Sequence, residues 1–97
     1  MRLPLRWTEQ AVAQLGAIAE HIATTSPVYA EQVVDRIVHR LQQARQFPES
    51  GRIVPEYERP EIRELIEVPY RVIYRAGPEA IEVVAILHSR QNLGERR

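Results

Sequence analysis

The chain has 97 residues, of which 44% are hydrophobic and 27% are charged, the proportions of an ordinary soluble domain. Thirteen basic residues cancel thirteen acidic ones, so any nucleic-acid site would have to be a local cluster rather than a global attraction. There is no cysteine, which excludes disulfides, a thiol nucleophile and a thiolate metal site.

Every basic residue is an arginine, the residue best suited to bidentate contact with carboxylate or phosphate. A GC-rich genome would produce the same bias without functional meaning. His21, His39 and His88 lack the spacing of metal ligands, so we expect neither a metal nor a cofactor. The N-terminus has no apolar signal region, and the longest apolar run is too short to span a bilayer; both features favour the cytoplasm.

Two helices are predicted in the first half of the chain. Residues 2–6 alternate in polarity, but Pro4 cannot donate to a ladder, so they should form an edge strand. Thr8 is a suitable N-cap for a helix that runs to about residue 24. Ser26, with Pro27 at the first helical position, begins a second helix that ends at Phe47-Pro48. The short link between them predicts an antiparallel helical hairpin.

Three strands are predicted in the second half. Residues 48–61 are rich in proline and charge and should form a long surface loop. The segments 62–68, 70–75 and 80–87 have strand character, and residues 76–79 supply a turn. The chain should therefore be one α+β domain over residues 1–97. Its order is β-α-α-β-β-β, with the helical hairpin packed on one face of a small antiparallel sheet.

The segment 70–75, YRVIYR, poses the functional question, because alternation places Arg71 and Arg75 together on one face of its strand. The turn suggests that residue 75 pairs with 80 and residue 71 with 84. One interpretation is structural, with Arg75 paired to Glu82 and Arg71 to Glu64. The other is that both guanidinium groups lie on an open concave surface, where they would meet a macromolecule.

Several motifs together resemble the RelE/ParE superfamily of toxins from bacterial type II toxin–antitoxin modules. They are F-P-x-x-G-R-x-V-P-E (47–56), I-R-E-L (62–65), Y-R-V-I-Y-R (70–75) and L-H-S-R (87–90). The resemblance implies a growth-inhibiting toxin that is neutralised by a cognate antitoxin in a hetero-oligomer. RelE-like members are ribosome-dependent endoribonucleases that cut mRNA, whereas ParE-like members poison DNA gyrase and carry no attributed nuclease chemistry.

Three residues match catalytic positions of RelE-like enzymes. Arg71 and Arg90 correspond to arginines that hold the scissile phosphate, and His88 lies where some members carry a histidine suited to proton transfer. His88 could equally be a strand-end histidine bonded to backbone. Two features argue against this branch: no tyrosine follows Tyr74, and the neutral chain lacks the lysines that neutralise phosphate.

The loop and the I-R-E-L segment are instead similar to ParE-like and plasmid-stabilisation sequences. That similarity favours a gyrase inhibitor that uses Arg52, Arg63 and Arg75 to bind its target, unless these arginines pair with nearby acids. The RelE-like mRNA interferase is the alternative, and an inactivated toxin that survives as a binding module is a third possibility.

Antitoxin contacts are expected on the helical hairpin and the adjacent sheet edge, where an amphipathic helix or strand could dock. The candidate residues are Val12, Leu15, Ile37 and Leu41, each of which could equally belong to the core.

Overall fold

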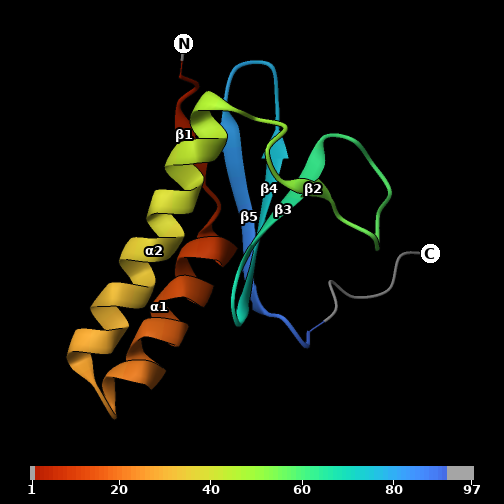
Figure 1. The fold of residues 1–97 in the computed structure, drawn as a ribbon. Coiled ribbons are helices and arrows are strands. Elements are labelled where there is room, and N and C mark those ends of the chain that lie inside the picture. Colours follow the sequence, from red (N-terminus) through yellow and green to blue (C-terminus); the bar gives the residue numbers. More distant parts are fainter. Residues whose placement is uncertain (1, 92–97) are drawn as a thin grey trace.

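The computed structural model describes residues 2–91 and contains a helical hairpin packed against a five-stranded sheet (Figure 1). The elements in chain order are β1 (Leu5–Trp7), α1 (Glu9–Ala23), α2 (Pro27–Gln46), β2 (Arg52–Ile53), β3 (Ile62–Glu67), β4 (Tyr70–Ala76) and β5 (Ile81–His88). Both helices lie on the same side of the sheet, which confirms the predicted α+β class and the hairpin. Within the described residues, neither helix is both long enough and apolar enough to cross a membrane.

The sheet has the strand order β1-β5-β4-β3-β2, so the first and last strands of the chain are neighbours. The β3–β4 and β4–β5 pairs are antiparallel, as predicted, and so is the β2–β3 pair, but β1 runs parallel to β5. Sequence reasoning also missed β2, a two-residue strand within the expected loop. β2 and β1 are the two edge strands of the sheet. The shortness of β2 and the proline that precedes β1 both limit pairing of these edges with another chain.

Side-chain caps fix both helix starts at the predicted residues. The Thr8 hydroxyl accepts a hydrogen bond from the Ala11 amide (3.1 Å), and the Ser26 hydroxyl accepts one from the Tyr29 amide (3.1 Å). Such caps contribute about 1 kcal/mol each. The Thr8 hydroxyl also lies 3.0 Å from the Val83 carbonyl oxygen, to which it donates, so the start of α1 is tied to β5.

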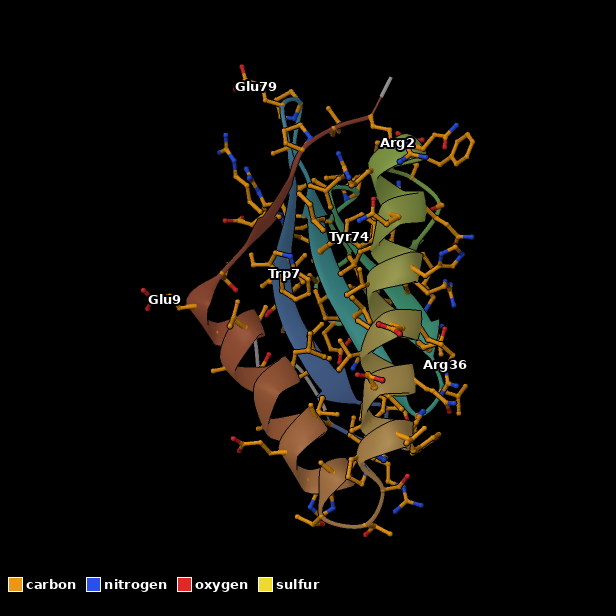
Figure 2. All side chains as sticks on the ribbon, turned by 90° about the vertical axis from the view of Figure 1, so that its left-hand side faces the viewer. Arg2, Trp7, Glu9, Arg36, Tyr74 and Glu79 are labelled. Carbon is orange, nitrogen blue, oxygen red and sulfur yellow. The ribbon has the colours of Figure 1, made fainter. Side chains whose placement is uncertain are left out.

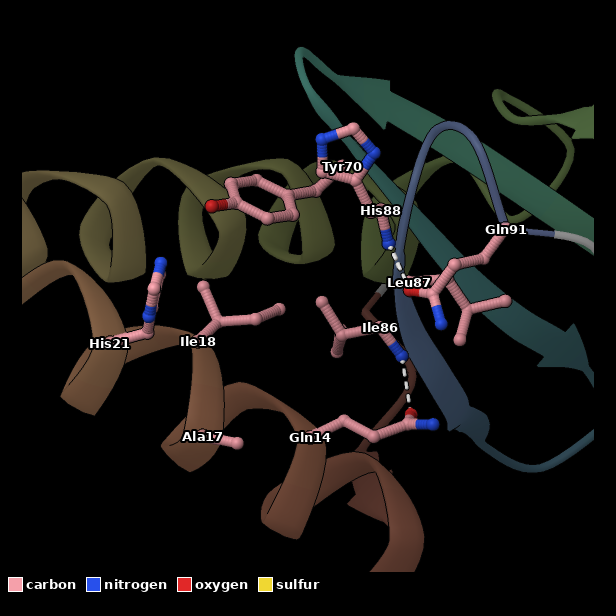
Figure 3. Close-up of a pocket in the computed structure, with 9 residues that line it drawn as sticks. All are labelled: Gln14, Ala17, Ile18, His21, Tyr70, Ile86, Leu87, His88 and Gln91. Atoms are coloured by element: carbon pink, nitrogen blue, oxygen red, sulfur yellow. Dashed lines mark hydrogen bonds between the residues drawn. The ribbon is translucent and has the colours of Figure 1, made fainter.

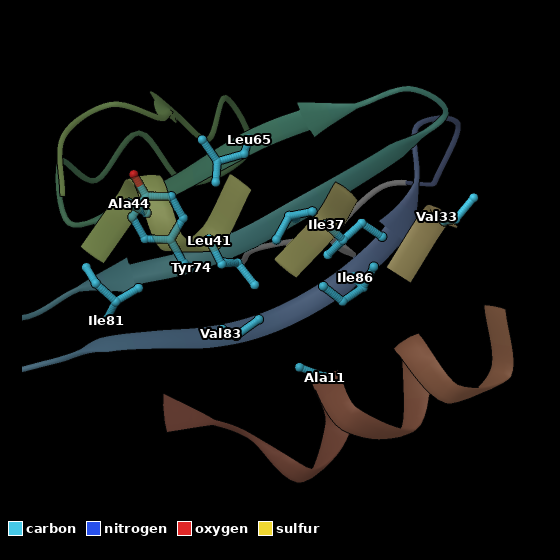
Figure 4. Packing of buried hydrophobic residues seen from close by; sticks show 11 residues of the cluster. Ala11, Val33, Ile37, Leu41, Ala44, Leu65, Tyr74, Ile81, Val83 and Ile86 are labelled. Carbon is cyan, nitrogen blue, oxygen red and sulfur yellow. The ribbon is translucent and has the colours of Figure 1, made fainter. Parts of the chain in front are cut away.

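The main core lies between the hairpin and the sheet (Figure 4). Its buried members are Ala11, Val33, Ile37, Leu41, Ala44, Leu65, Val72, Tyr74, Ile81, Val83 and Ile86. Ile37 and Leu41 are both 0% exposed. The expectation that these two residues contact the antitoxin is therefore wrong, because the stripe of α2 that carries them faces the sheet.

A second, smaller cluster covers the opposite face of the sheet. Val54, Ile73, Ala85 and Leu87 form it, and Tyr57, Ile62 and Val84 pack against them. Since Val72 and Tyr74 belong to the main core, β4 alternates between the two faces as its sequence predicts. The loop of residues 54–61, where Glu58 adopts a positive φ of 55°, is the element that seals this second face.

The predicted register of the β4–β5 pair is wrong. Arg71 lies opposite Leu87, and Arg75 lies opposite Glu82. The turn is longer than assumed, and the register shifts where Ile73 pairs with Ala85 but Tyr74 pairs with Val83, which leaves Val84 as an extra residue. Such a bulge shifts the alternation of side chains by one residue, so that the positions beyond it point to the opposite faces from those expected. No local pattern in the sequence predicts the bulge.

The two glycines at positions 51 and 16 should respond oppositely to alanine. A Cβ at Gly51 would lie 2.7 Å from the Glu64 carbonyl oxygen and 2.8 Å from the Tyr74 hydroxyl, whereas a Cβ at Gly16 meets nothing within 4 Å. Gly51→Ala should destabilise the fold by about 1–3 kcal/mol because of overpacking. Gly16→Ala should stabilise it by about 0.5–1 kcal/mol, since glycine is unfavourable within a helix. Urea unfolding measures both, and equal effects would contradict the packing around Gly51.

Candidate functional site

Arg71, the arginine that the sequence singles out, is buried in a cage of acceptors. Only 6% of the residue is exposed. Its Nε donates to Glu64 Oε1 (2.7 Å), and its two terminal nitrogens donate to the two carboxylate oxygens of Glu56 (2.9 Å each). One of these nitrogens also donates to the Gln91 carbonyl oxygen (2.9 Å). Four bonds therefore engage the guanidinium fork.

Glu64 extends this cage into a chain of alternating charges. The Glu64 residue is 1% exposed, and its second carboxylate oxygen accepts from the Nε of Arg52 on β2. The side chain of Arg52 is 62% exposed, so it covers the buried acid from the solvent side. The series Glu56–Arg71–Glu64–Arg52 joins the loop, β4, β3 and β2, and its charges cancel. We call it the charge quartet.

The quartet keeps Arg71 in its charged form. Hydrogen bonds to Glu56, and then to Glu64, raise the pKa of the Arg71 guanidinium above its already high ordinary value, against the opposing effect of burial. The expectation of an open guanidinium that meets a macromolecule is therefore wrong for Arg71. The structural alternative is confirmed, because Arg71 pairs with Glu64 as that interpretation required.

Arg63 is also engaged by the protein itself. Its Nε donates to the Pro60 carbonyl oxygen (2.8 Å), and one terminal nitrogen donates to the carbonyl oxygens of Glu49 (3.2 Å) and Gly51 (3.0 Å). These bonds clamp both ends of the loop that precedes β3. Arg63 thus positions the loop.

Tyr74 closes the same loop from within the sheet. Its hydroxyl donates to the Pro48 carbonyl oxygen (2.7 Å) and accepts from the Gly51 amide (3.0 Å). Burial raises the pKa of Tyr74 above its ordinary value of 10.0. No local pattern in the sequence reveals that this hydroxyl orders a turn more than twenty residues earlier in the chain.

His88 lies at the end of β5, on the other side of the sheet from Arg71. It is opposite Tyr70, and the two rings meet edge to face with centroids 6.0 Å apart (Figure 3). Tyr70 packs against the main core, whereas Leu87, which is opposite Arg71, belongs to the second cluster. The side chains of Arg71 and His88 therefore do not converge on one site.

Around His88 the chain forms a pocket of about 340 Å³ between α1 and the end of β5. Its polar lining includes Gln14, whose side chain accepts from the Ile86 amide (2.8 Å), and Gln91, whose side chain accepts from the His88 amide (2.8 Å) (Figure 3). The Nδ1 atom of His88 accepts from the backbone amide of Arg90 (3.2 Å). Arg90 itself is exposed. These bonds cap the end of β5. They match the alternative in which His88 is a strand-end histidine bonded to the backbone.

Arg75 remains on the surface, at the turn end of the sheet. In the ladder Glu82 lies between Arg75 on β4 and Arg6 on β1, so the three residues form a row across neighbouring strands. Arg75 and Arg6 are both exposed and line a shallow hollow of about 200 Å³ beside the turn. Sequence reasoning missed Arg6, because the parallel pairing of β1 with β5 is a long-range contact.

An apolar groove lies between the two helices and beside β1. Its lining residues are Trp7, Val12, Leu15, Gly16, Ala19 and Val34, and its volume is about 490 Å³. Val12 is 55% exposed. We call this feature the hairpin groove. It contains Val12 and Leu15, two of the four residues that the sequence suggests for antitoxin contact. The unusual mid-helix Gly16 was the sequence signal that could have located the groove.

Within residues 2–91 no group of three or more histidine, aspartate or glutamate side chains could hold a metal ion. The open surfaces of residues 2–91 include the turn-end arginine row and the hairpin groove. At the centre of the charge quartet, by contrast, Arg71 and Glu64 are buried.

Comparison with known proteins identifies the family. Residues 5–93 match the family model described as the ParE toxin of the type II toxin–antitoxin system parDE. The chain belongs to this family and is a toxin of the RelE/ParE superfamily.

Individual relatives agree. Toxin RelE2 of Caulobacter vibrioides is 31% identical over 84 residues, which cover 86% of this chain and 91% of the relative. Y4kP of Sinorhizobium fredii is 32% identical over 92 residues, which cover 93% of this chain and 92% of the relative. A solved structure from the chromosomal ParDE toxin–antitoxin system of P. aeruginosa is 29% identical, with a TM-score of 0.73 and coverage of 90% of this chain and 96% of that one.

Removal of the Arg71 guanidinium should strongly destabilise the fold. Arg71→Met leaves two carboxylates without their shared cation, and breaking a buried pair costs about 3–5 kcal/mol. Arg75→Met, on the same strand but exposed, should change stability by less than about 0.5 kcal/mol. Urea unfolding compares the two variants, and similar midpoints would refute the quartet as a structural element.

The Tyr74 hydroxyl should make stability depend on alkaline pH. At pH 7, Tyr74→Phe should cost about 1–3 kcal/mol because the Gly51 amide loses its acceptor. The raised pKa means that the unfolded tyrosine loses its proton first, so wild-type stability declines above pH 10 and the difference from Tyr74→Phe shrinks. Tyr29→Phe, at an exposed position, should show no such convergence in unfolding measured from pH 7 to 11.

Proposed function

We propose that this toxin inhibits DNA gyrase in the cytoplasm through protein–protein contacts and that it is not a ribonuclease. The state of Arg71 is the observation that carries the proposal. Glu56 and Glu64 hold its guanidinium fork, and a fork engaged in this way is not available to a phosphate.

The remaining residues of the RelE-like set support the same conclusion. Hydrolysis of a phosphodiester needs a group that transfers protons near the cation that stabilises the developing charge. His88 lies on the other face of the sheet from Arg71. A chain with zero net charge also lacks the general attraction that would bring it to ribosomal RNA.

The turn-end row offers the better surface for a protein target. Arg75 and Arg6 are exposed, and arginine is enriched where proteins bind one another. Arg52 is a weaker candidate, because it already pairs with Glu64, and Arg63 is set aside because the loop occupies it. A second candidate function, mRNA cleavage on the ribosome, stays open since a relative bears the name RelE2.

A cognate antitoxin would neutralise the toxin in a hetero-oligomer, and the hairpin groove is the surface that fits it. The lining of the groove is apolar. Trp7, which lines it, packs against the main core, whereas the neighbouring Arg6 of the arginine row lies on the opposite face of β1. Val12 and Leu15 remain the antitoxin-contact residues from the sequence, joined by Trp7 and Val34.

Purified toxin should inhibit DNA supercoiling by gyrase, and in cells that lack the antitoxin DNA synthesis should stop before translation. The double variant Arg6→Ala/Arg75→Ala should need about ten-fold more protein for half-inhibition, a loss of about 1.4 kcal/mol of binding. Arg59→Ala, at an exposed arginine that pairs with its neighbour Glu61, serves as the matched control.

An earlier stop of translation, with mRNA cut on ribosomes, would favour the interferase instead. Inhibition by the double variant equal to that of wild type would contradict the assignment of the row. Harmless expression in cells without antitoxin would indicate an inactivated toxin that only binds.

A further inference from the structure

The last strand, β5, lacks a strand neighbour along its second half. β1 lies beside β5 only as far as Trp7, which is opposite Val83. Figure 2 shows Trp7 at the end of β1 and Glu9 at the start of α1, where the chain leaves the sheet. Beyond this point no strand of residues 2–91 pairs with residues 84–88 on the side away from β4. We call this stretch the open edge of β5.

Glutamine side chains occupy the backbone amides of the open edge. The Ile86 amide donates to Gln14 Oε1, and the His88 amide donates to Gln91 Oε1, at 2.8 Å each (Figure 3). The amides of alternate residues point to the same edge of a strand, so a neighbouring strand would present its carbonyl oxygens to these two amides. The glutamine oxygens thus stand where the carbonyl oxygens of an added strand would lie.

The pocket around His88 lies beside the open edge and can receive a side chain. Its volume is about 340 Å³, and Ile18 from α1, Tyr70 from β4 and Ile86 from β5 contribute to its lining. No arginine, aspartate or glutamate lines it, so burial of a charged side chain there would lack a partner of opposite charge. The lining therefore suits an uncharged, apolar side chain.

Helix α1 separates this pocket from the hairpin groove. Gln14 and Ala17 line the pocket, whereas Val12 and Ala19 line the groove. Residues two positions apart on an α-helix point to nearly opposite sides, so the two hollows lie on opposite sides of α1. An antitoxin bound in the groove would leave the open edge accessible to a different partner.

The open edge lies instead beside the surface proposed for the target. Glu82, the centre of the turn-end arginine row, precedes Val84 by two residues on the same strand, a rise of about 7 Å. A partner that contacts Arg6 at the row can therefore also reach the first residues of the open edge.

Resting on the proposed inhibition of gyrase, we propose that the open edge of β5 binds an extended, uncharged segment of the target protein as an added β-strand. Carbonyl oxygens of this segment replace those of Gln14 and Gln91 at the Ile86 and His88 amides. One of its apolar side chains enters the pocket. The main-chain bonds supply affinity in this mode of recognition, and the pocket supplies specificity.

A second copy of this chain does not fit the open edge. The bond from the Ile86 amide to Gln14 holds α1 within one side chain of the edge. A two-fold pairing of β5 with β5 would bring the α1 helices of both copies to the same edge. A single extended segment needs much less room.

One test fills the pocket without touching the backbone of β5. Ala17→Trp, at an exposed pocket residue, should need at least ten-fold more toxin than wild type for half-inhibition of supercoiling by purified gyrase. It should still bind the antitoxin encoded in the neighbouring reading frame, which also reports that the fold is intact. Ala13→Trp, at an exposed α1 position that lines neither hollow, is the matched control and should inhibit like wild type.

Hydrogen–deuterium exchange tests the added strand directly. In the free toxin, Gln14→Ala/Gln91→Ala should speed exchange of the Ile86 and His88 amides at least ten-fold, because both lose their acceptors to water. Gyrase should slow the exchange of both amides again, in this variant and in wild type. Fast exchange in the gyrase complex would overturn the inference, and so would slow exchange in the free variant, since another part of the chain would then cover the edge.

The outcomes separate this inference from the proposed function. If Ala17→Trp inhibits gyrase as well as wild type does, the inference is wrong and the gyrase function stands. Loss of antitoxin binding with inhibition retained would also overturn it, in favour of the antitoxin as the occupant. If Ala17→Trp loses both activities, the exchange measurement decides. Failure of wild type to inhibit gyrase at all would contradict the proposed function, on which the inference rests.

Discussion

The interaction on which the rest of the structure depends is the one that Arg71 makes with Glu56 and Glu64. A guanidinium group removed from water is tolerated only where carboxylates satisfy its charge and its donors, and a buried carboxylate needs such a partner in return. Here the requirement joins residues from β3, β4 and the loop at 54–61, and Arg52 extends it to β2. The loop is thereby held against the sheet face that lies opposite the helices.

That constraint decides which surfaces remain open. The hairpin covers one face of the sheet, and the loop with its small apolar cluster covers the other. Among the surfaces of residues 2–91 that stay open are the turn end of the sheet and the outer side of the hairpin. One of these surfaces carries exposed arginines, and the other contains the apolar hairpin groove. Two surfaces of such different chemistry suit a toxin that must meet a target and an antitoxin.

The candidate site could be predicted from the sequence only in part. The motifs around Arg71 and His88 led to the correct superfamily. A matching motif, however, does not show whether a side chain is exposed or already paired inside the protein. The sequence alone does not distinguish an arginine that pairs with two carboxylates inside the protein from one that binds a phosphate. The apolar stripes likewise predicted both helices, but periodicity does not distinguish Ile37, which faces the core, from Leu15, which lines the groove.

The sequence by itself determined what short-range physics controls. Thr8, Ser26 and Pro27 start the helices because caps and proline act on the next few residues, and alternation in 70–75 sorts side chains between two faces. Only the tertiary structure decided the parallel contact of β1 with β5, the bulge at Val84 and the meeting of Glu56 with Arg71. These contacts depend on the balance of desolvation and packing between segments that are distant in the chain. A short stretch of neighbouring residues therefore does not determine them.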